Sequence, residues 1–165
     1  MLDKRDEYAY TSVMRVQRNT ESCTTLLLLP CDCANLRRAA RAVSRLYSQE
    51  LRPDGIEITQ FTLLMALNLA GEIPQGKLGE ILALDSTSLT RMLGLLKRYG
   101  WVKAKEGADR RLRIFSLTPA GKAKFQQALP HWKRAQERFE TALGARTASE
   151  LKGLLAEVTQ ASLGR

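Results

Sequence analysis

The sequence predicts a mainly α-helical fold that carries one small β-hairpin. Apolar residues recur at spacings of three and four through most of residues 31–100 and again beyond residue 118, as they do on the buried face of a helix. Between these regions, residues 101–117 alternate apolar with charged or polar residues on both sides of a glycine. With 165 residues, of which 44% are hydrophobic, the chain can form one domain with a substantial core.

The first part of the chain predicts an arm followed by a helix. Residues 1–30 show no sustained periodicity and are expected to form a mobile N-terminal arm. A helix follows from Cys31 to Leu51, where residues 53–55 (Pro-Asp-Gly) break the pattern. With its loop it makes a predicted N-terminal dimerisation segment over residues 31–58. The next helix is expected to take Thr59 as its N-cap and to end at Gly71.

Two consecutive helices over residues 74–100 have the spacing of a helix-turn-helix. A short helix over residues 74–83 leads through Leu84 into a helix capped by Asp85 and ended by Gly100. The inward positions of the second helix are Leu89, Met92, Leu93 and Leu96. Its first turns carry small hydroxyl residues and then Arg91, so that this helix end could read base edges in a major groove. The alternative is that serine and threonine are present only because they start helices well.

The alternating segment after Gly100 predicts a hairpin joined directly to the second helix, which is called a wing. The strands are expected on either side of a turn at residues 107–110. The Asp109 carboxylate, two residues before Arg111, would orient its guanidinium for a minor groove through a charge-assisted hydrogen bond. Alternatively, this is a solvated turn whose basic residues keep an edge hairpin soluble. Residues 59–118 form the predicted winged helix-turn-helix lobe.

The C-terminal residues 119–165 predict two dimerisation helices. Thr118 and Pro119 are a favourable cap and first position, and Pro130 predicts a kink in a long helix. Residues 147–150 (Thr-Ala-Ser-Glu) match a capping box before a final helix. These two helices and the helix over residues 31–51 have more apolar surface than the winged lobe can cover. A homodimer built from the terminal helices is therefore expected.

The net charge narrows the class of partner. Lysine and arginine total 26 against 17 acidic residues, for a formal charge of +9, which favours nucleic acid or an anionic membrane surface. Since no apolar run is long enough to cross a bilayer or to form the core of a signal peptide, we expect a cytoplasmic protein without a membrane partner. The sequence has a single histidine, His131, and no glycine-rich phosphate loop, so neither an enzyme nor a cofactor is expected.

Three cysteines lie close together at Cys23, Cys31 and Cys33. At the predicted start of a helix and near two arginines, Cys31 and Cys33 would have lowered thiol pKa values, which is compatible with peroxide or electrophile sensing. A structural role is the alternative, and a thiol peroxidase is conceivable. Metal binding is disfavoured, because C-x-C with one separate cysteine is a weak ligand pattern and the histidine is far away in the sequence.

From Cys31 to the C-terminus the chain resembles the MarR family of winged helix-turn-helix transcriptional regulators. The segment "DRRLRIFSLTPAGK" is similar to the D-x-R wing of that family and to the "LT-x-x-G" start of its long helix. The resemblance implies that Asp109 and Arg111 are the D-x-R pair and that Gly100 ends the recognition helix. Two positions depart from the family pattern: Gly94 lies where a larger residue is usual, and Leu95 lies where a polar one is common.

The resemblance implies a homodimer that binds double-stranded DNA at a pseudo-palindromic operator and acts as a repressor released by a small ligand. The residues expected to contact DNA are Ser86, Thr87, Ser88, Thr90, Arg91, Arg98, Asp109, Arg110, Arg111 and Arg113. A small anionic or aromatic effector could bind near Tyr47, Phe61 and Trp132, unless these aromatic residues belong to the core. Two alternatives stay open: a redox-sensing regulator that uses Cys31 and Cys33, or a winged-helix module that binds RNA or protein.

Overall fold

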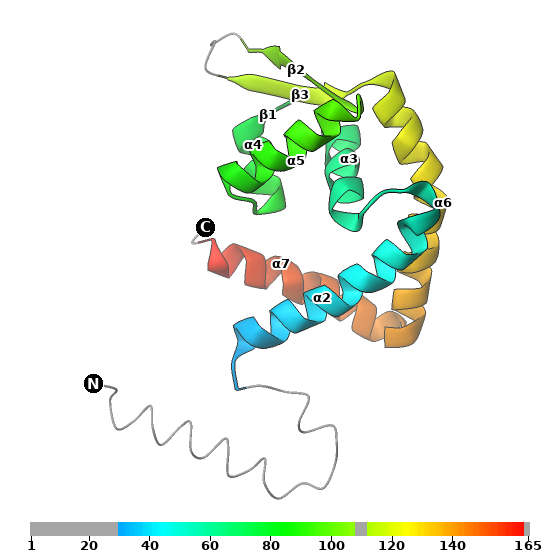
Figure 1. Cartoon of the computed structure of the whole chain (residues 1–165). Coiled ribbons are helices and arrows are strands. Elements are labelled where there is room, and N and C mark those ends of the chain that lie inside the picture. Colours follow the sequence, from blue (N-terminus) through cyan, green and yellow to red (C-terminus); the bar gives the residue numbers. More distant parts are fainter. Residues whose placement is uncertain (1–29, 108–111, 164–165) are drawn as a thin grey trace, which may run out of the picture. The chain divides into compact units, whose positions relative to one another are not determined.

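The computed structural model describes residues 30–107 and 112–163 (Figure 1), so residues 1–29 of the predicted arm and residues 108–111 at the tip of the wing lie outside the described residues. Its elements are α2 (Asp32–Leu51), the 3₁₀ turn η2 (Arg52–Asp54), α3 (Ile58–Ala70), β1 (Ile73–Pro74), α4 (Gln75–Leu82), α5 (Ser86–Arg98), β2 (Val102–Glu106), β3 (Arg113–Leu117), α6 (Pro119–Leu143) and α7 (Ala145–Ser162). Two units meet within α2, after Ser44, and the larger one contains every element that follows. The predicted mainly α-helical class with a small β element is confirmed.

The sheet has three antiparallel strands in the order β1-β3-β2, one more than the sequence predicts. The hairpin pairs Val102 with Leu117, while β1 pairs Ile73 with Phe115. A strand of two residues is too short to show a period, so that only its pairing with β3 makes β1 recognisable. The inward side chains of all three strands are buried, and the sheet therefore closes one side of the core.

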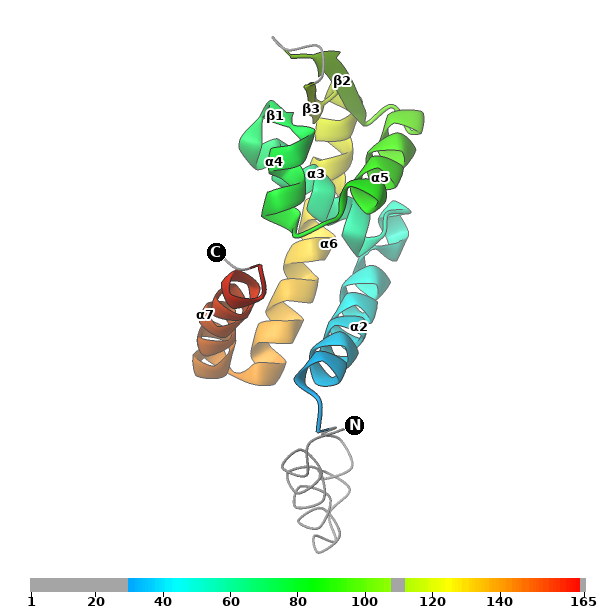
Figure 2. The same ribbon diagram turned by 90° about the vertical axis from the view of Figure 1, so that its left-hand side faces the viewer.

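The core of the larger unit lies between the sheet, α3, α5 and α6, which surround it in Figures 1 and 2. Its centre is Phe61 on α3, which is fully buried and stacks on two rings of α6, Phe125 and Trp132, at centroid distances of 5.3 and 5.9 Å. The buried members are Leu51, Ile56, Phe61, Leu63, Leu64, Leu67, Ile73, Leu78, Leu89, Leu93, Leu96, Val102, Phe115, Leu117, Phe125 and Ala128. This core joins the helix-turn-helix and the hairpin into one rigid support.

The predicted caps of α5 and α6 are confirmed, whereas the predicted start of α3 is wrong. The Asp85 and Thr118 side chains accept hydrogen bonds from the amides of residues 88 and 121. The helix α3 begins before Thr59, with Glu57 as its N-cap, and the Glu57 amide donates to Gln60 Oε1 at 3.3 Å. Glutamine at the third helical position completes this capping box, which decides against the intrinsically better cap Thr59.

The two C-terminal helices are joined by Gly144 alone. The helix α6 continues through Pro130 and follows a curved path in Figure 1. Gly144 ends α6 and precedes α7 with φ +80° and ψ 147°, a conformation that glycine adopts readily. The capping box predicted at Thr147–Glu150 is therefore wrong, because α7 has already begun at Ala145. This short connection leaves no room for a side-chain cap between the helices.

A buried polar pair ties η2 to α6. The Asp54 side chain is only 3% exposed, and its Oδ2 lies 2.7 Å from His131 Nδ1. The imidazole ring is thus in close contact with a buried carboxylate. Lys124, also on α6, donates to the Asp54 main-chain carbonyl. The single histidine of the chain thus helps to hold the segment between α2 and α3.

Candidate nucleic-acid interface

The helix α5 presents a continuous stripe to solvent. Leu89, Leu93 and Leu96 bury one face against the core, as predicted, and Met92 is half-buried. The opposite face carries residues spaced by four, three and four positions, all of them exposed: Thr87, Arg91, Gly94 and Arg98. Two arginines one turn on either side of a glycine form a cationic edge that is wide enough to face a polyanion.

The N-terminal end of α5 is bonded to α4. Thr90 Oγ1 donates to the Ser86 carbonyl at 2.7 Å and accepts from Gln75 Nε2 at 2.8 Å. The predicted contact residue Thr90 is exposed, but its hydroxyl is already engaged within the helix-turn-helix. Gln75 is a residue of this surface that the sequence analysis missed. Gln75 is the first residue of α4, and its hydrogen bond shows that this end lies beside α5.

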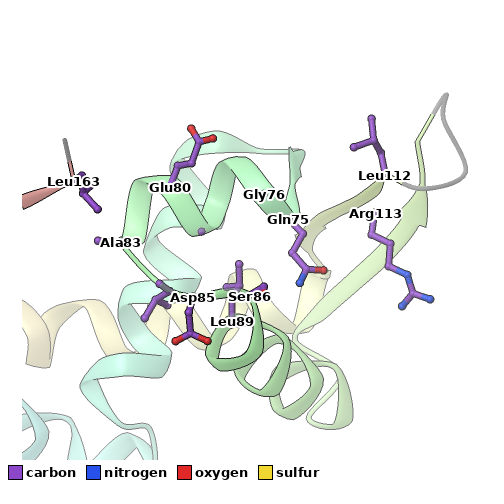
Figure 3. Close-up of a pocket in the computed structure, with 12 residues that line it drawn as sticks. Gln75, Gly76, Glu80, Ala83, Asp85, Ser86, Leu89, Leu112, Arg113 and Leu163 are labelled. Carbon is purple, nitrogen blue, oxygen red and sulfur yellow. The ribbon is translucent and has the colours of Figure 1, made fainter. Parts of the chain in front are cut away.

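A cavity of about 620 Å³ opens beside this junction. Figure 3 shows its lining: Gln75 and Ser86 lie between the hairpin residues Leu112 and Arg113 on one side and Leu163 on the other. The remaining lining residues belong to α4, α5 and their connection, in which Ala83 adopts a left-handed conformation with φ 49°. The cavity therefore separates the start of α5 from the base of the wing.

The base of the wing is closed by a hydrogen bond from the Gly107 amide to the Leu112 carbonyl at 2.7 Å. Arg113 starts β3 and is exposed, in register with Glu106. Lys105 pairs with Glu72 at 2.5 Å, and its hydrogen bond holds the pKa of Glu72 below the usual range. Three predicted contact residues, Asp109, Arg110 and Arg111, lie outside the described residues.

Of the three aromatic residues predicted to line a ligand pocket, Tyr47 and Phe61 pack against α6, and Trp132 belongs to α6. Phe61 and Trp132 belong to the stacked core cluster. Tyr47 is 7% exposed and donates to Gln136 Oε1 at 2.6 Å. Burial, and secondarily the charge of Glu140, raises the pKa of the Tyr47 hydroxyl. The structure thus places these side chains as core residues, and the cavity beside α4 and α5 has other walls.

The two described cysteines lie at the start of α2. Cys31 directly precedes the helix and Cys33 is its second residue, and both are exposed and unpaired. Across residues 30–107 and 112–163, no group of histidine, cysteine and acidic side chains could hold a metal ion. Within the same ranges, no helix is sufficiently long and apolar to span a bilayer.

The Asp85 cap predicts a pH-dependent contribution to stability. Hydrogen bonds from the amide and then the hydroxyl of Ser88 hold the pKa of Asp85 below its usual value. A lowered folded pKa stabilises the protein above the unfolded value and ceases to do so as the pH falls through the folded one. We expect Asp85→Ala to lower the melting temperature by a few degrees at neutral pH, with a smaller difference below about pH 4. Asp85→Asn, which keeps a capping oxygen, is the control, and equal melting of all three proteins at pH 7 would contradict the role of the cap.

Comparisons with known proteins agree with this geometry. The model of the MarR family matches residues 54–112. Over 111 residues the chain is 33% identical to the multiple antibiotic resistance protein MarR of Salmonella typhimurium, covering 67% of this chain and 76% of that protein. The fold is similar to the crystal structure of the transcriptional regulator MosR of M. tuberculosis in complex with DNA, with a TM-score of 0.75 and 32% identity. The match covers 81% of this chain and 97% of that chain. A mutant MarR from E. coli complexed with operator DNA matches with a TM-score of 0.69 and 28% identity, over 74% of this chain and 89% of that chain.

Proposed function

The chain belongs to the MarR family, and we propose that it is a cytoplasmic transcriptional regulator that binds a pseudo-palindromic operator in double-stranded DNA as a homodimer. The observation that carries this proposal is the exposed stripe of α5, where Arg91 and Arg98 flank Gly94 on a helix capped by Asp85. The similar structures of MosR and MarR were determined with DNA, which supports the same class of partner here.

Exposed apolar residues on α7 support the dimer. Leu154, Leu155 and Val158 are 57%, 46% and 41% exposed and share one face of the helix. When a second copy covers a face of this kind, apolar surface is removed from water and the free energy falls. Two copies related by a twofold axis would present their α5 helices to successive major grooves on one side of the duplex.

The two parts of the winged lobe have different tasks in this proposal. The first turns of α5, from Ser86 to Arg91, enter the major groove and read base edges. The tip of the wing, residues 108–111, follows the adjacent minor groove, with Asp109 orienting Arg111. The net charge of +9 adds attraction that is independent of sequence and weakens with salt.

The test is selection of duplexes from a random library by the full chain, followed by sedimentation of the free protein. We expect the selected sequences to contain two inverted half-sites whose centres are about 10 base pairs apart. The free protein should have about twice its chain mass of 18.5 kDa. A well-folded monomer would contradict the dimer, and stronger binding of structured RNA than of the selected duplex would contradict the DNA-binding function.

We propose that the protein is regulated by a small anionic or aromatic effector, whose binding releases the operator. The family membership suggests this mode. The exposed thiols of Cys31 and Cys33 favour a second mode, in which peroxide oxidises one thiol to a sulfenic acid with release of water, and a second thiol then condenses with it to a disulfide with release of another water. In that mode, peroxide should lower affinity for the selected duplex by about tenfold or more, and a reductant should restore it. A variant with serine at both positions should not respond, and an unchanged response would rule these cysteines out.

A further inference from the structure

Gly94 lies in the exposed stripe of α5, between its two arginines. It follows Arg91 by one turn and precedes Arg98 by one turn. A Cβ built on Gly94 would meet no heavy atom within 4 Å outside the backbone of its own helix. Nothing inside the protein therefore requires a glycine here, although glycine weakens an exposed helix relative to alanine.

A solvent-open hollow lies on the outer surface of α5, and Gly94 is among the residues that line it. Its ends are cationic, because Arg91 and Arg98 lie at opposite ends of Gly94. One flank is apolar and consists of the half-buried side chains of Met92 and Leu95. Ser88 completes the lining. The hollow is thus a small apolar depression within a cationic surface, on the helix that the proposed function places in the major groove.

This combination matches one feature of the major groove. The cationic ends alone are sufficient to bind phosphates. An apolar flank would contribute nothing to phosphate binding. Among the base pairs, those with thymine present a methyl group, attached to C5, in the major groove. Transfer of one methyl group from water into contact with apolar carbon lowers the free energy. A glycine lets that group approach the helix backbone closely.

We propose that the hollow over Gly94 receives the C5-methyl group of one thymine in each operator half-site. Gly94 supplies the space, Leu95 and Met92 supply the apolar contact, and Arg91 and Arg98 hold the flanking DNA. Gly94 and Leu95 are then specificity-determining residues. The inference rests on the proposed function, because it requires that α5 lies in the major groove.

The first experiment removes the methyl group from the DNA. The probe is the duplex selected by the full chain, with each thymine replaced in turn by deoxyuridine at both symmetric positions. We expect one such pair to weaken binding by about fourfold per half-site, or about fifteenfold in total, as loss of one buried methyl group implies. With Leu95→Ala the same replacement should have a much smaller effect, because the apolar contact is already lost.

The second experiment moves the methyl group from the DNA to the protein. Gly94→Ala should bind the selected duplex at least about fivefold more weakly, because its new methyl group lies where the thymine methyl group would approach the helix backbone. Deoxyuridine at the identified position should restore most of that loss. The control is Gly153→Ala on α7, another exposed helical glycine with open space at its Cβ position. Both variants should melt at or above the parent temperature, which excludes misfolding as the cause.

The outcomes separate this inference from the proposed function. If a duplex is selected and bound, but every deoxyuridine replacement is neutral or no thymine occurs in the half-site, the hollow does not receive a methyl group. Binding of Gly94→Ala that equals the parent would also overturn the inference and leave the DNA-binding function intact. If no duplex is selected, both fail together.

Discussion

Replacement of Gly121 by alanine is expected to destabilise the protein by about 3 kcal/mol or more, the upper range for overpacking of a tight site. A Cβ on Gly121 would lie 1.9 Å from the carbonyl oxygen of Trp101. That oxygen cannot move freely, because it accepts from the Thr118 amide at 3.0 Å. The Thr118 hydroxyl in turn donates to the Gly100 carbonyl at 2.6 Å. Alanine would push the first turn of α6 away from the start of β2.

The control is the same substitution at a glycine where the opposite change in stability is expected. At Gly153 of α7 the Cβ position is open, so alanine should stabilise the helix by about 1 kcal/mol. Urea unfolding measures both free energies, and the melting temperature of Gly121→Ala should fall by roughly 6–12 °C. If alanine at the two positions changes stability equally, the close approach to Trp101 does not constrain the fold.

The second large effect is expected at Arg91. The side chain is exposed on α5, one turn before Gly94, and bidentate pairing with a base edge contributes about 1–3 kcal/mol. Since a homodimer loses the contact twice, Arg91→Ala should lower the affinity for the selected duplex by about 2–6 kcal/mol, or from about 30-fold to above 10⁴-fold. The loss should relax preference at one base position of each half-site. Arg91→Lys, which keeps the charge but not the planar fork, should lose the same preference.

Substitution of Arg111 in the wing should have a different signature. We expect Arg111→Ala to weaken binding to many sequences, to reduce the salt slope by about one unit per lost phosphate-associated charge, and to lose most where an A·T-rich flank narrows the minor groove. Asp109→Ala should do less. Arg146→Ala, on the C-terminal helix α7, removes the same charge outside the winged lobe and should leave the binding unchanged. If Arg111→Ala binds as tightly as the parent across a salt series, the wing is only a solvated hairpin. For the preceding prediction, full affinity of Arg91→Ala would mean that α5 does not read bases through this residue.

Much of the candidate interface could be predicted because its signals are local. Asp85 caps α5 through the amide of residue 88, three positions along, and the apolar period of α5 identifies its buried face without reference to other elements. Gln75 was missed because its role depends on a hydrogen bond to Thr90, fifteen residues away. The hollow over Gly94 was foreshadowed by an unusual residue, but only the structure shows that no neighbouring atom fills the space.

By itself the sequence determined the order of helices, the position of the hairpin, the caps at Asp85 and Thr118 and the cationic edge of α5, because residues within one or two turns dictate each of these features. The tertiary structure alone decided which residues meet across long separations. It paired Ile73 with Phe115 as a third strand, placed Phe61 between two rings of α6 and brought the oxygen of Trp101 against Gly121. Such contacts depend on how whole elements pack, and a pattern read along the chain contains no information about the distance between them.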